Sequence, residues 1–238
     1  MIAEKRTKSP PAFTVSLLQP GSTQDEIEAA VTVINDAFGY FNPPPDEKNF
    51  FVGDKTFMPD LHRYQILCGL VGGKVYVAKT NETSEVVGAA VWFGPGQELG
   101  AAEAQEEQQR IFNAFLEKIG RKYPGLPAWW TNYFLPTYSQ FTSRVLGDPT
   151  YKLDAWHLQL IGVASRTKGQ GIGTALMKVA MDEAALCEKP RERRLTVEAG
   201  PRGFYKALGF VERGEHKFES EQGIEMPLCC LSCDKESV

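Results

Sequence analysis

Residues 168–173, Lys-Gly-Gln-Gly-Ile-Gly (KGQGIG), decide how the rest of the chain is interpreted. An apolar run, AWHLQLIGVA at 155–164, precedes them, and a helical pattern of apolar residues follows. Glycine is about 1 kcal/mol less favourable than alanine inside a helix, so three alternating glycines where one begins indicate a need for bare backbone. A turn of this kind gathers backbone N–H groups at the positive end of the helix, an arrangement that binds phosphate.

Two common phosphate-binding motifs do not fit this spacing. A P-loop ends in Gly-Lys-Ser/Thr, and no such ending follows, while a GxGxxG dinucleotide fingerprint would need glycine at Thr174. A dinucleotide turn would also normally follow a first strand, whereas this turn lies near residue 170. A plain tight turn with close helix packing remains the structural alternative.

The order of the other elements predicts a single α/β domain with a mixed sheet. The early strands join as a hairpin, which implies antiparallel pairing, and the strand–helix–strand unit at 155–199 implies one parallel pair through a right-handed crossover. Apolar periodicity predicts strands at 13–18, 155–164, 193–199, 209–218 and 224–231, a hairpin at 74–94, and helices at 23–38, 57–70, 101–120, 171–187 and 200–209.

The domain is expected to span 13–232, between a disordered lead-in (1–12) and a tail (233–238). Residues 94–154, between the third and fourth strands, form a helical insertion that is aromatic-rich and only loosely helical in its second half. The proline-rich stretch at 39–49 is expected to be a loop.

Composition excludes several classes of protein. The net charge is −4 and no block of Lys or Arg dominates, which argues against nucleic acid as a partner. No run approaches 18 apolar residues, so no membrane span is expected. Five cysteines, an odd number, and a first segment without an apolar core favour a reducing, cytoplasmic setting. No Cys or His pair at zinc spacing accompanies the CCLSC stretch, so no metal is expected.

Two motifs together resemble those of a known family. The run Val163-Ala-Ser-Arg-Thr-Lys-Gly-Gln-Gly-Ile-Gly173 resembles the acyl-CoA-binding motif of the GNAT superfamily of N-acetyltransferases, with Lys168 where Arg or Gln is usual. About 30 residues later, Gly203-Phe-Tyr-Lys-Ala-Leu-Gly-Phe210 is similar to the second signature of that family. The resemblance covers 155–212 firmly, and the order of elements extends it loosely to 13–232.

The resemblance implies a central sheet that is mostly antiparallel, flanked by helices, with two parallel central strands that splay apart. Acetyl-CoA, the expected co-substrate, would lie in that gap. Backbone groups near Ile161 and Val163 would hold its pantetheine and acetyl carbonyl. The pyrophosphate would be held by the glycine turn: Lys168, Gly169, Gln170, Gly171, Ile172, Gly173 and Thr174.

The implied reaction is direct attack of a primary amine, of a small molecule, on the acetyl thioester in a ternary complex. An alkyl amine has a pKa of about 10, so a base must remove a proton, and the leaving thiolate benefits from an acid. Tyr205 matches the tyrosine of the second signature and is the candidate acid. For the base, His157 lies six residues before Val163, so strand alternation predicts that both face the same side. Glu198, at the end of the neighbouring strand, is the rival, and a water chain without a single base is the third alternative.

The substrate is the least defined part of this interpretation. Trp129, Trp130, Tyr133 and Tyr138 could wall an acceptor pocket, pack as the core of an extra helix, or form a homodimer contact. Two other functions stay open: an acyl-CoA-binding regulator of the same fold without turnover, and a nucleotide-binding protein of another fold. Within enzymes, a longer acyl donor is also compatible with the motifs.

Overall fold

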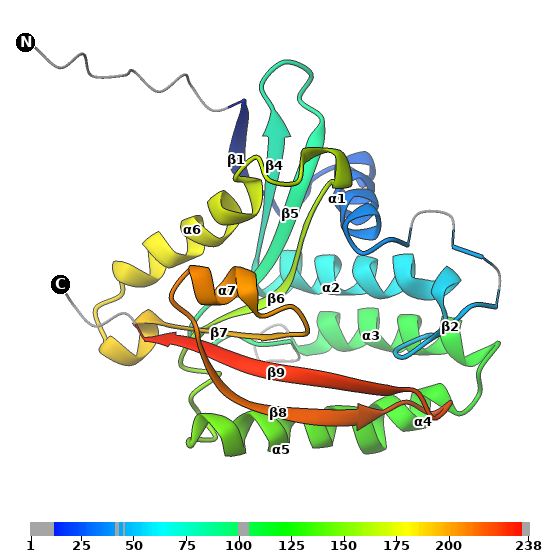
Figure 1. Cartoon of the computed structure of the whole chain (residues 1–238). Coiled ribbons are helices and arrows are strands. Elements are labelled where there is room, and N and C mark those ends of the chain that lie inside the picture. The colour runs from blue at the N-terminus through cyan, green and yellow to red at the C-terminus, as the bar shows by residue number, and fades with distance from the viewer. Residues whose placement is uncertain (1–11, 41–42, 45, 100–104, 235–238) are drawn as a thin grey trace, which may run out of the picture.

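The computed structural model describes residues 12–40, 43–44, 46–99 and 105–234. Its centre is a seven-stranded sheet in the order β1–β4–β5–β6–β7–β9–β8 (Figure 1). The strands are β1 (Phe13–Leu18), β4 (Lys74–Thr80), β5 (Val86–Phe93), β6 (Trp156–Val163), β7 (Arg194–Ala199), β8 (Val211–Glu219) and β9 (Glu225–Asp234). A separate small hairpin pairs β2 (Lys48–Asn49) with β3 (Gly53–Asp54).

Helices cover both faces of this sheet. They are α1 (Gln24–Ala37), α2 (Met58–Gly72), α3 (Gln105–Gly120), α4 (Leu126–Trp129), the π-helix η2 (Trp130–Phe134), α5 (Leu135–Leu146), α6 (Ile172–Ala185) and α7 (Gly203–Ala207). Three short 3₁₀ turns accompany them: η1 (Lys55–Phe57), η3 (Ser165–Thr167) and η4 (Pro190–Arg193). The first helix begins at a capping box, in which Thr23 and Glu26 bond each other's backbone N–H.

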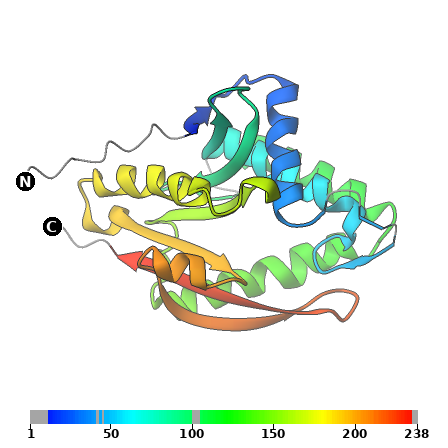
Figure 2. The same cartoon turned by 45° about the horizontal axis from the view of Figure 1, so that its top comes forward.

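The sheet is antiparallel throughout except for β6 and β7, which run parallel. This confirms the predicted mixed sheet with one parallel pair. The parallel ladder joins Trp156 to Leu195 at one end and Leu158 to Val197 at the other. Beyond Leu158 the pairing with β7 stops although β6 continues to Val163, so the two strands diverge (Figure 2). The implied splay of the central strands is therefore present.

Helix α1 lies on one face of the sheet and α6 on the other (Figures 1 and 2). Two glycines mark how closely they approach. A Cβ atom on Gly162 would lie 2.8 Å from Ala37 of α1, and one on Gly88 would lie 2.7 Å from Ile172 of α6. Any side chain at either position would force a helix away from the sheet, so the layered packing depends on both residues.

The segment between β5 and β6 builds a second hydrophobic core. Its helices α3, α4, η2 and α5 pack with α2 and with the outer strands β8 and β9. Aromatic side chains dominate this core, among them Trp129, Trp130, Phe134, Phe141 and Phe218. The loosely helical part of the sequence is thus three consecutive helical pieces, including a π-helical turn.

Two element boundaries differ from the sequence expectations. The small β2–β3 hairpin starts within the expected loop at 39–49. Strand β9 continues to Asp234 instead of ending before 233, because Cys233 pairs with Leu195 of β7 and its side chain is buried. Of the expected lead-in, residues 1–11 lie outside the described part of the chain, as do 235–238 of the tail.

Candidate active site

The glycine turn between β6 and α6 is built by backbone conformation. Gly169 and Gly171 have φ of 80° and 83°, the left-handed region that favours glycine, and a Cβ on either would meet nothing within 4 Å. Gly173 differs, because its Cβ would contact the ring of Phe204 at 3.4 Å and Val163 at 3.6 Å. Two of the glycines therefore set the path of the chain, and the third lets the Phe204 ring lie close to the helix.

The turn leaves backbone donors at the start of α6. Ala175 N–H donates to Gly171 O (3.0 Å), so the N–H groups of Ile172, Gly173 and Thr174 precede the first bonds of the helix. The approach to the turn is tied to α1, because Ser165 N–H donates to Asp36 Oδ2 (2.6 Å). Unbonded N–H groups at a helix N-terminus, reached by a glycine turn, fit a phosphate group.

Tyr205 lies on α7, next to this turn. Its neighbour Phe204 contacts Gly173 as above, and the Tyr205 ring packs between Phe204 and Phe210 with centroids 5.2 and 6.0 Å away. Tyr205 is buried, and burial raises the pKa of its phenol to about 12. The hydroxyl therefore stays protonated at neutral pH and can donate a hydrogen bond or a proton to a developing anion.

The expectation that His157 and Val163 share a face of β6 is wrong. Val163 pairs with Gly88 and His157 with Phe93, so six steps along β6 oppose five along β5, and the register shifts where Gln159 is the extra residue. A one-residue bulge reverses the alternation of side chains. Val163 consequently lies toward α6, while His157 lies on the opposite face.

His157 joins Glu198 in a buried polar cluster beside the last rung of the parallel ladder. His157 Nε2 is 3.7 Å from Glu198 Oε2, and each side chain is only 4% exposed. The other ring nitrogen, Nδ1, is 3.1 Å from the hydroxyl of buried Thr196. His157 and Thr196 are neighbours in the ladder, and Glu198 follows Thr196 by two residues on the same side of β7. The two residues proposed as alternative bases therefore lie together.

Three further side chains complete this cluster. The Tyr138 hydroxyl donates to Glu198 Oε2, Cys230 Sγ donates to Glu198 Oε1 (3.4 Å), and Lys152 Nζ lies 3.6 Å from Glu198 Oε2. Burial alone would raise the pKa of Glu198, but Lys152, His157, Tyr138 and Cys230 together lower it. Burial, reinforced by Lys152, lowers the pKa of His157 to about 3, although Glu198 and Gln159 oppose this shift. At neutral pH Glu198 is a carboxylate and His157 a neutral imidazole.

The four aromatic candidates for an acceptor pocket have different environments. Trp129 and Trp130 are buried in the second core, and their indole N–H groups donate to the backbone oxygens of Glu219 (3.0 Å) and Phe51 (2.8 Å). Tyr133 is exposed on η2, and its hydroxyl accepts from Glu219 N–H (3.3 Å). Only Tyr138, of these four, reaches the cluster around Glu198.

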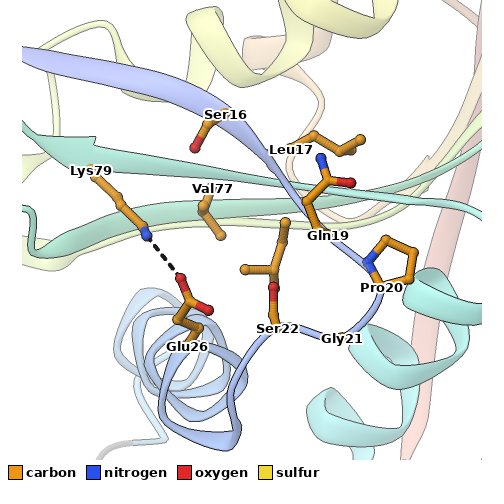
Figure 3. A pocket seen from close by; sticks show the side chains of 10 residues that line it. Ser16, Leu17, Gln19, Pro20, Gly21, Ser22, Glu26, Val77 and Lys79 are labelled. Atoms are coloured by element: carbon orange, nitrogen blue, oxygen red, sulfur yellow. Dashed lines mark hydrogen bonds and ion pairs between the residues drawn. The ribbon is translucent and has the colours of Figure 1, made fainter.

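A cavity of about 310 Å³ lies elsewhere, at the start of α1 (Figure 3). Its lining comes from β1, β4 and the β1–α1 turn, with the Lys79–Glu26 ion pair (3.3 Å) on one side. Strand β1 is separated from β6 by β4 and β5 in the sheet, so this cavity is not part of the site at the glycine turn.

The described residues hold neither a metal-binding group nor a membrane-crossing helix. No group of three or more His, Cys, Asp or Glu side chains is arranged to hold a metal ion in the described part of the chain. Likewise, none of the described helices combines the length and apolarity that a membrane crossing requires.

Comparison with known proteins agrees with this geometry. Residues 141–212 match the sequence model of the acetyltransferase (GNAT) domain, and this segment holds the glycine turn, His157, Glu198 and Tyr205. A search of curated proteins found no match. This segment is therefore similar to the GNAT acetyltransferase domain, the family that the two sequence motifs resemble.

Solved structures show the same fold along nearly the whole chain. A Corynebacterium glutamicum protein described as histone acetyltransferase HPA2 and related acetyltransferase is 19% identical, with a TM-score of 0.52 over 95% of this chain and 98% of that one. The polyamine N-acetyltransferase of Drosophila melanogaster is 14% identical (TM-score 0.54, covering 94% and 100%). A mosquito arylalkylamine N-acetyltransferase-like protein is also 14% identical (TM-score 0.54, covering 92% and 98%).

Sequence reasoning missed Lys152, Thr196 and Cys230 in this site. Lys152 lies in the turn before β6 and Cys230 on β9, both far in sequence from the glycine motif. No local pattern connects them with Glu198, because their proximity arises from the pairing of β7 with β9 and from the packing of the insertion.

Proposed function

We propose that this protein transfers an acetyl group from acetyl-CoA to a primary amine of a small molecule. The observation that carries the proposal is the glycine turn with unbonded N–H groups at the divergence of β6 and β7, beside Tyr205. In this proposal the pyrophosphate binds the backbone of 168–174, and the pantetheine lies in the gap along β6 near Ile161 and Val163. The family uses acetyl-CoA, and these groups fit its phosphate end.

The reaction forms a nitrogen–carbon bond and breaks the carbon–sulfur bond of the thioester. The ammonium form of the amine first loses one proton, which leaves through the base to solvent. The free amine then attacks the carbonyl carbon, and a second nitrogen proton is lost as the tetrahedral intermediate collapses. Tyr205 donates a proton to the departing thiolate and is reprotonated at the expense of that second nitrogen proton, so that the products are an N-acetylamine, the CoA thiol and the one proton released to solvent.

We assign the proton-accepting role to His157 rather than to Glu198. Both carboxylate oxygens of Glu198 already have partners, because Tyr138 and Lys152 lie at Oε2 and Cys230 at Oε1. His157 is neutral, so it has a lone pair to accept a proton directly or through water, and the adjacent carboxylate would balance the charge of the imidazolium. In the resting protein burial keeps this imidazole weakly basic.

The substrate class follows from the chemistry and from what the fold accommodates. Two solved proteins with this fold are named as a polyamine N-acetyltransferase and an arylalkylamine N-acetyltransferase-like protein, which supports a small amine as the acceptor. We infer that the acceptor approaches from the His157 face of the sheet, where Tyr138 lies beside Glu198.

A melting experiment with acetyl-CoA tests the proposal first. A ligand at about 100 times its Kd adds roughly 2.7 kcal/mol to stability, which should raise Tm by about 5–10 °C for a chain of this size. NAD and ATP at the same concentration serve as controls and should give no comparable shift. A positive result leads to a screen of amines by thiol release. No shift at millimolar acetyl-CoA would overturn the proposal.

A further inference from the structure

The helical insertion between β5 and β6 contributes side chains to the polar cluster of His157 on β6 and Glu198 on β7. Tyr138 comes from α5, and Lys152 from the turn between α5 and β6. Both reach Glu198 at the end of β7, in the segment that matches the family model. Packing alone does not explain why an insertion with an aromatic core would place an ammonium group there.

The geometry links Lys152 to Glu198 and Tyr138 at once. Lys152 Nζ lies 2.6 Å from the Tyr138 hydroxyl, 4.3 Å from the centre of the Tyr138 ring and 3.6 Å from Glu198 Oε2. The ammonium is thus held over the ring face and against the carboxylate. Lys152 is 17% exposed, compared with 4% for Glu198 and for His157. Lys152 is therefore more exposed to solvent than Glu198 or His157.

Lys152 supplies positive charge beside the buried Glu198 carboxylate. Groups facing His157 and Glu198 come from every element packed on them: Lys152 from the turn, Tyr138 from α5, Cys230 from β9 and, more distantly, Glu98 beside Tyr138. Lys152 is the only cation that acts on the pair among the described residues. Without it, a buried carboxylate would face a neutral imidazole with no compensating charge, which is strongly unfavourable.

We propose that Lys152 and Tyr138 are positioning residues that hold the Glu198–His157 pair in its proton-poor form, ionised at Glu198 and neutral at His157, ready to receive the proton of the amine. This inference rests on the proposed function, because it assigns the insertion a role in the same acetyl-transfer site. In the step itself one proton moves from the ammonium to His157, and Glu198 balances the imidazolium charge. No other reactant is consumed.

Removing the positive charge tests the proposal. In Lys152→Met, both Glu198 and His157 gain affinity for a proton, so the pair should titrate at higher pH, by about one unit or more. NMR of the histidine ring protons measures this directly, with His157 identified by the loss of its signal in His157→Gln. Lys152→Arg keeps the charge and should restore the wild-type midpoint.

Kinetics supply a second readout. The acidic limb of kcat/KM, measured by thiol release, should move upward with the NMR midpoint in Lys152→Met and return in Lys152→Arg. Tyr138→Phe keeps the ring and removes only the donor to Glu198, so a smaller shift in the same direction is expected. Lys118→Met is the matched control, because Lys118 is an exposed lysine of the same insertion that pairs with Asp60 at 2.7 Å. It should move neither readout.

A folding defect would not obscure the result. If Lys152→Met fails to fold, Glu198→Gln is compared with the double variant Lys152→Met/Glu198→Gln, in which no buried carboxylate lacks a partner. The His157 midpoint should still be higher in the double variant. Unchanged midpoints in folded variants would overturn the inference and leave the proposed function intact. Shifted midpoints in a protein that acetylates no amine would instead contradict the function.

Discussion

Gly173 and Phe204 face each other where α6 begins: a Cβ on Gly173 would lie 3.4 Å from Phe204 Cζ, a distance of ordinary contact. The Phe204 ring is 38% exposed and stacks edge-on against Tyr205. The first motif and the second motif of the sequence therefore meet at this point, and the size of residue 173 controls where the ring lies.

Enlarging residue 173 should weaken acetyl-CoA binding. In Gly173→Leu the atoms beyond Cβ would clash with the Phe204 ring, because Cβ itself is already in contact with that ring. The ring must therefore move over the start of α6. We expect the acetyl-CoA Kd to rise at least about tenfold, which corresponds to about 1.4 kcal/mol, as measured by calorimetry. Gly173→Ala is the control, because its Cβ makes only ordinary contact, and it should bind almost normally. Equal affinities in the two variants would contradict the assignment.

A second glycine should matter through conformation alone. Gly171 has φ of 83° with open space around its Cβ, so Gly171→Ala introduces backbone strain of about 1–2 kcal/mol without a clash. Urea unfolding should show this loss, and acetyl-CoA affinity should fall because the N–H groups move. Gly200→Ala, also with nothing within 4 Å and without positive φ, should be nearly neutral. A similar loss in both variants would show that strain at Gly171 is not the cause.

Removing the Tyr205 hydroxyl should affect turnover more than binding. Tyr205→Phe keeps the ring between Phe204 and Phe210, so acetyl-CoA affinity should change less than about threefold. Loss of the proton donor should lower kcat by about 10²–10⁴, which thiol-release kinetics will measure. Tyr64→Phe removes a buried hydroxyl in the second core and controls for general effects. Normal turnover in Tyr205→Phe would remove this residue as the acid.

Stability should fall as the solution becomes moderately acidic. Burial lowers the pKa of His62 and of His157 from 6.5 to about 3, so between these values the unfolded chain binds more protons than the folded one. Their stabilising contribution is complete above pH 6.5 and is lost as the pH falls toward 3, with a slope of about 1.4 kcal/mol per pH unit for each group. Urea unfolding between pH 5 and 6.5 measures this slope, in a range where carboxylates stay ionised.

Single variants separate the two histidines. His62→Gln and His157→Gln should each reduce the slope by about the contribution of one proton, whatever their effect on stability at neutral pH. His62 Nδ1 lies 2.6 Å from Asn35 Oδ1, so His62→Gln is expected to lower the stability at pH 7 as well. A slope that stays at the wild-type value in both variants would show that neither histidine is kept neutral by the fold.

Local pattern was sufficient for most of the fold. The alternation at 13–18, the apolar period of α1 and the run before the glycines each predicted the correct element, because burial of one face fixes both pattern and structure. The two motifs located Tyr205 and the turn. The prediction that His157 and Val163 face the same side of β6 was wrong. A single extra residue, Gln159, reverses the direction of the side chains that precede it in β6. Nothing in the alternation of the sequence reveals this bulge.

The cluster around Glu198 could not be predicted in the same way. Glu198 meets Cys230 only through the register of β7 on β9, and Lys152 only through the course of the insertion. The aromatic content of the sequence also did not separate these side chains by environment. Trp129 and Trp130 donate to backbone oxygens inside the second core, whereas Tyr138 donates to the Glu198 carboxylate. Contacts of high sequence separation depend on topology, which a single sequence does not specify.

The short parallel ladder has a mechanical consequence. Only three residue pairs, from Trp156–Leu195 to Leu158–Val197, join the half of the sheet that ends at β6 to the half that begins at β7. The two halves of the sheet are thus joined by these three pairs at one end of the β6–β7 boundary, and α6 and the insertion pack across that boundary. An extended molecule bound between the diverging parts of β6 and β7 would contact both halves and hold them together. Backbone amides of β6 and β7 where the two strands diverge should then exchange with solvent faster in the free protein than in the protein with that molecule bound.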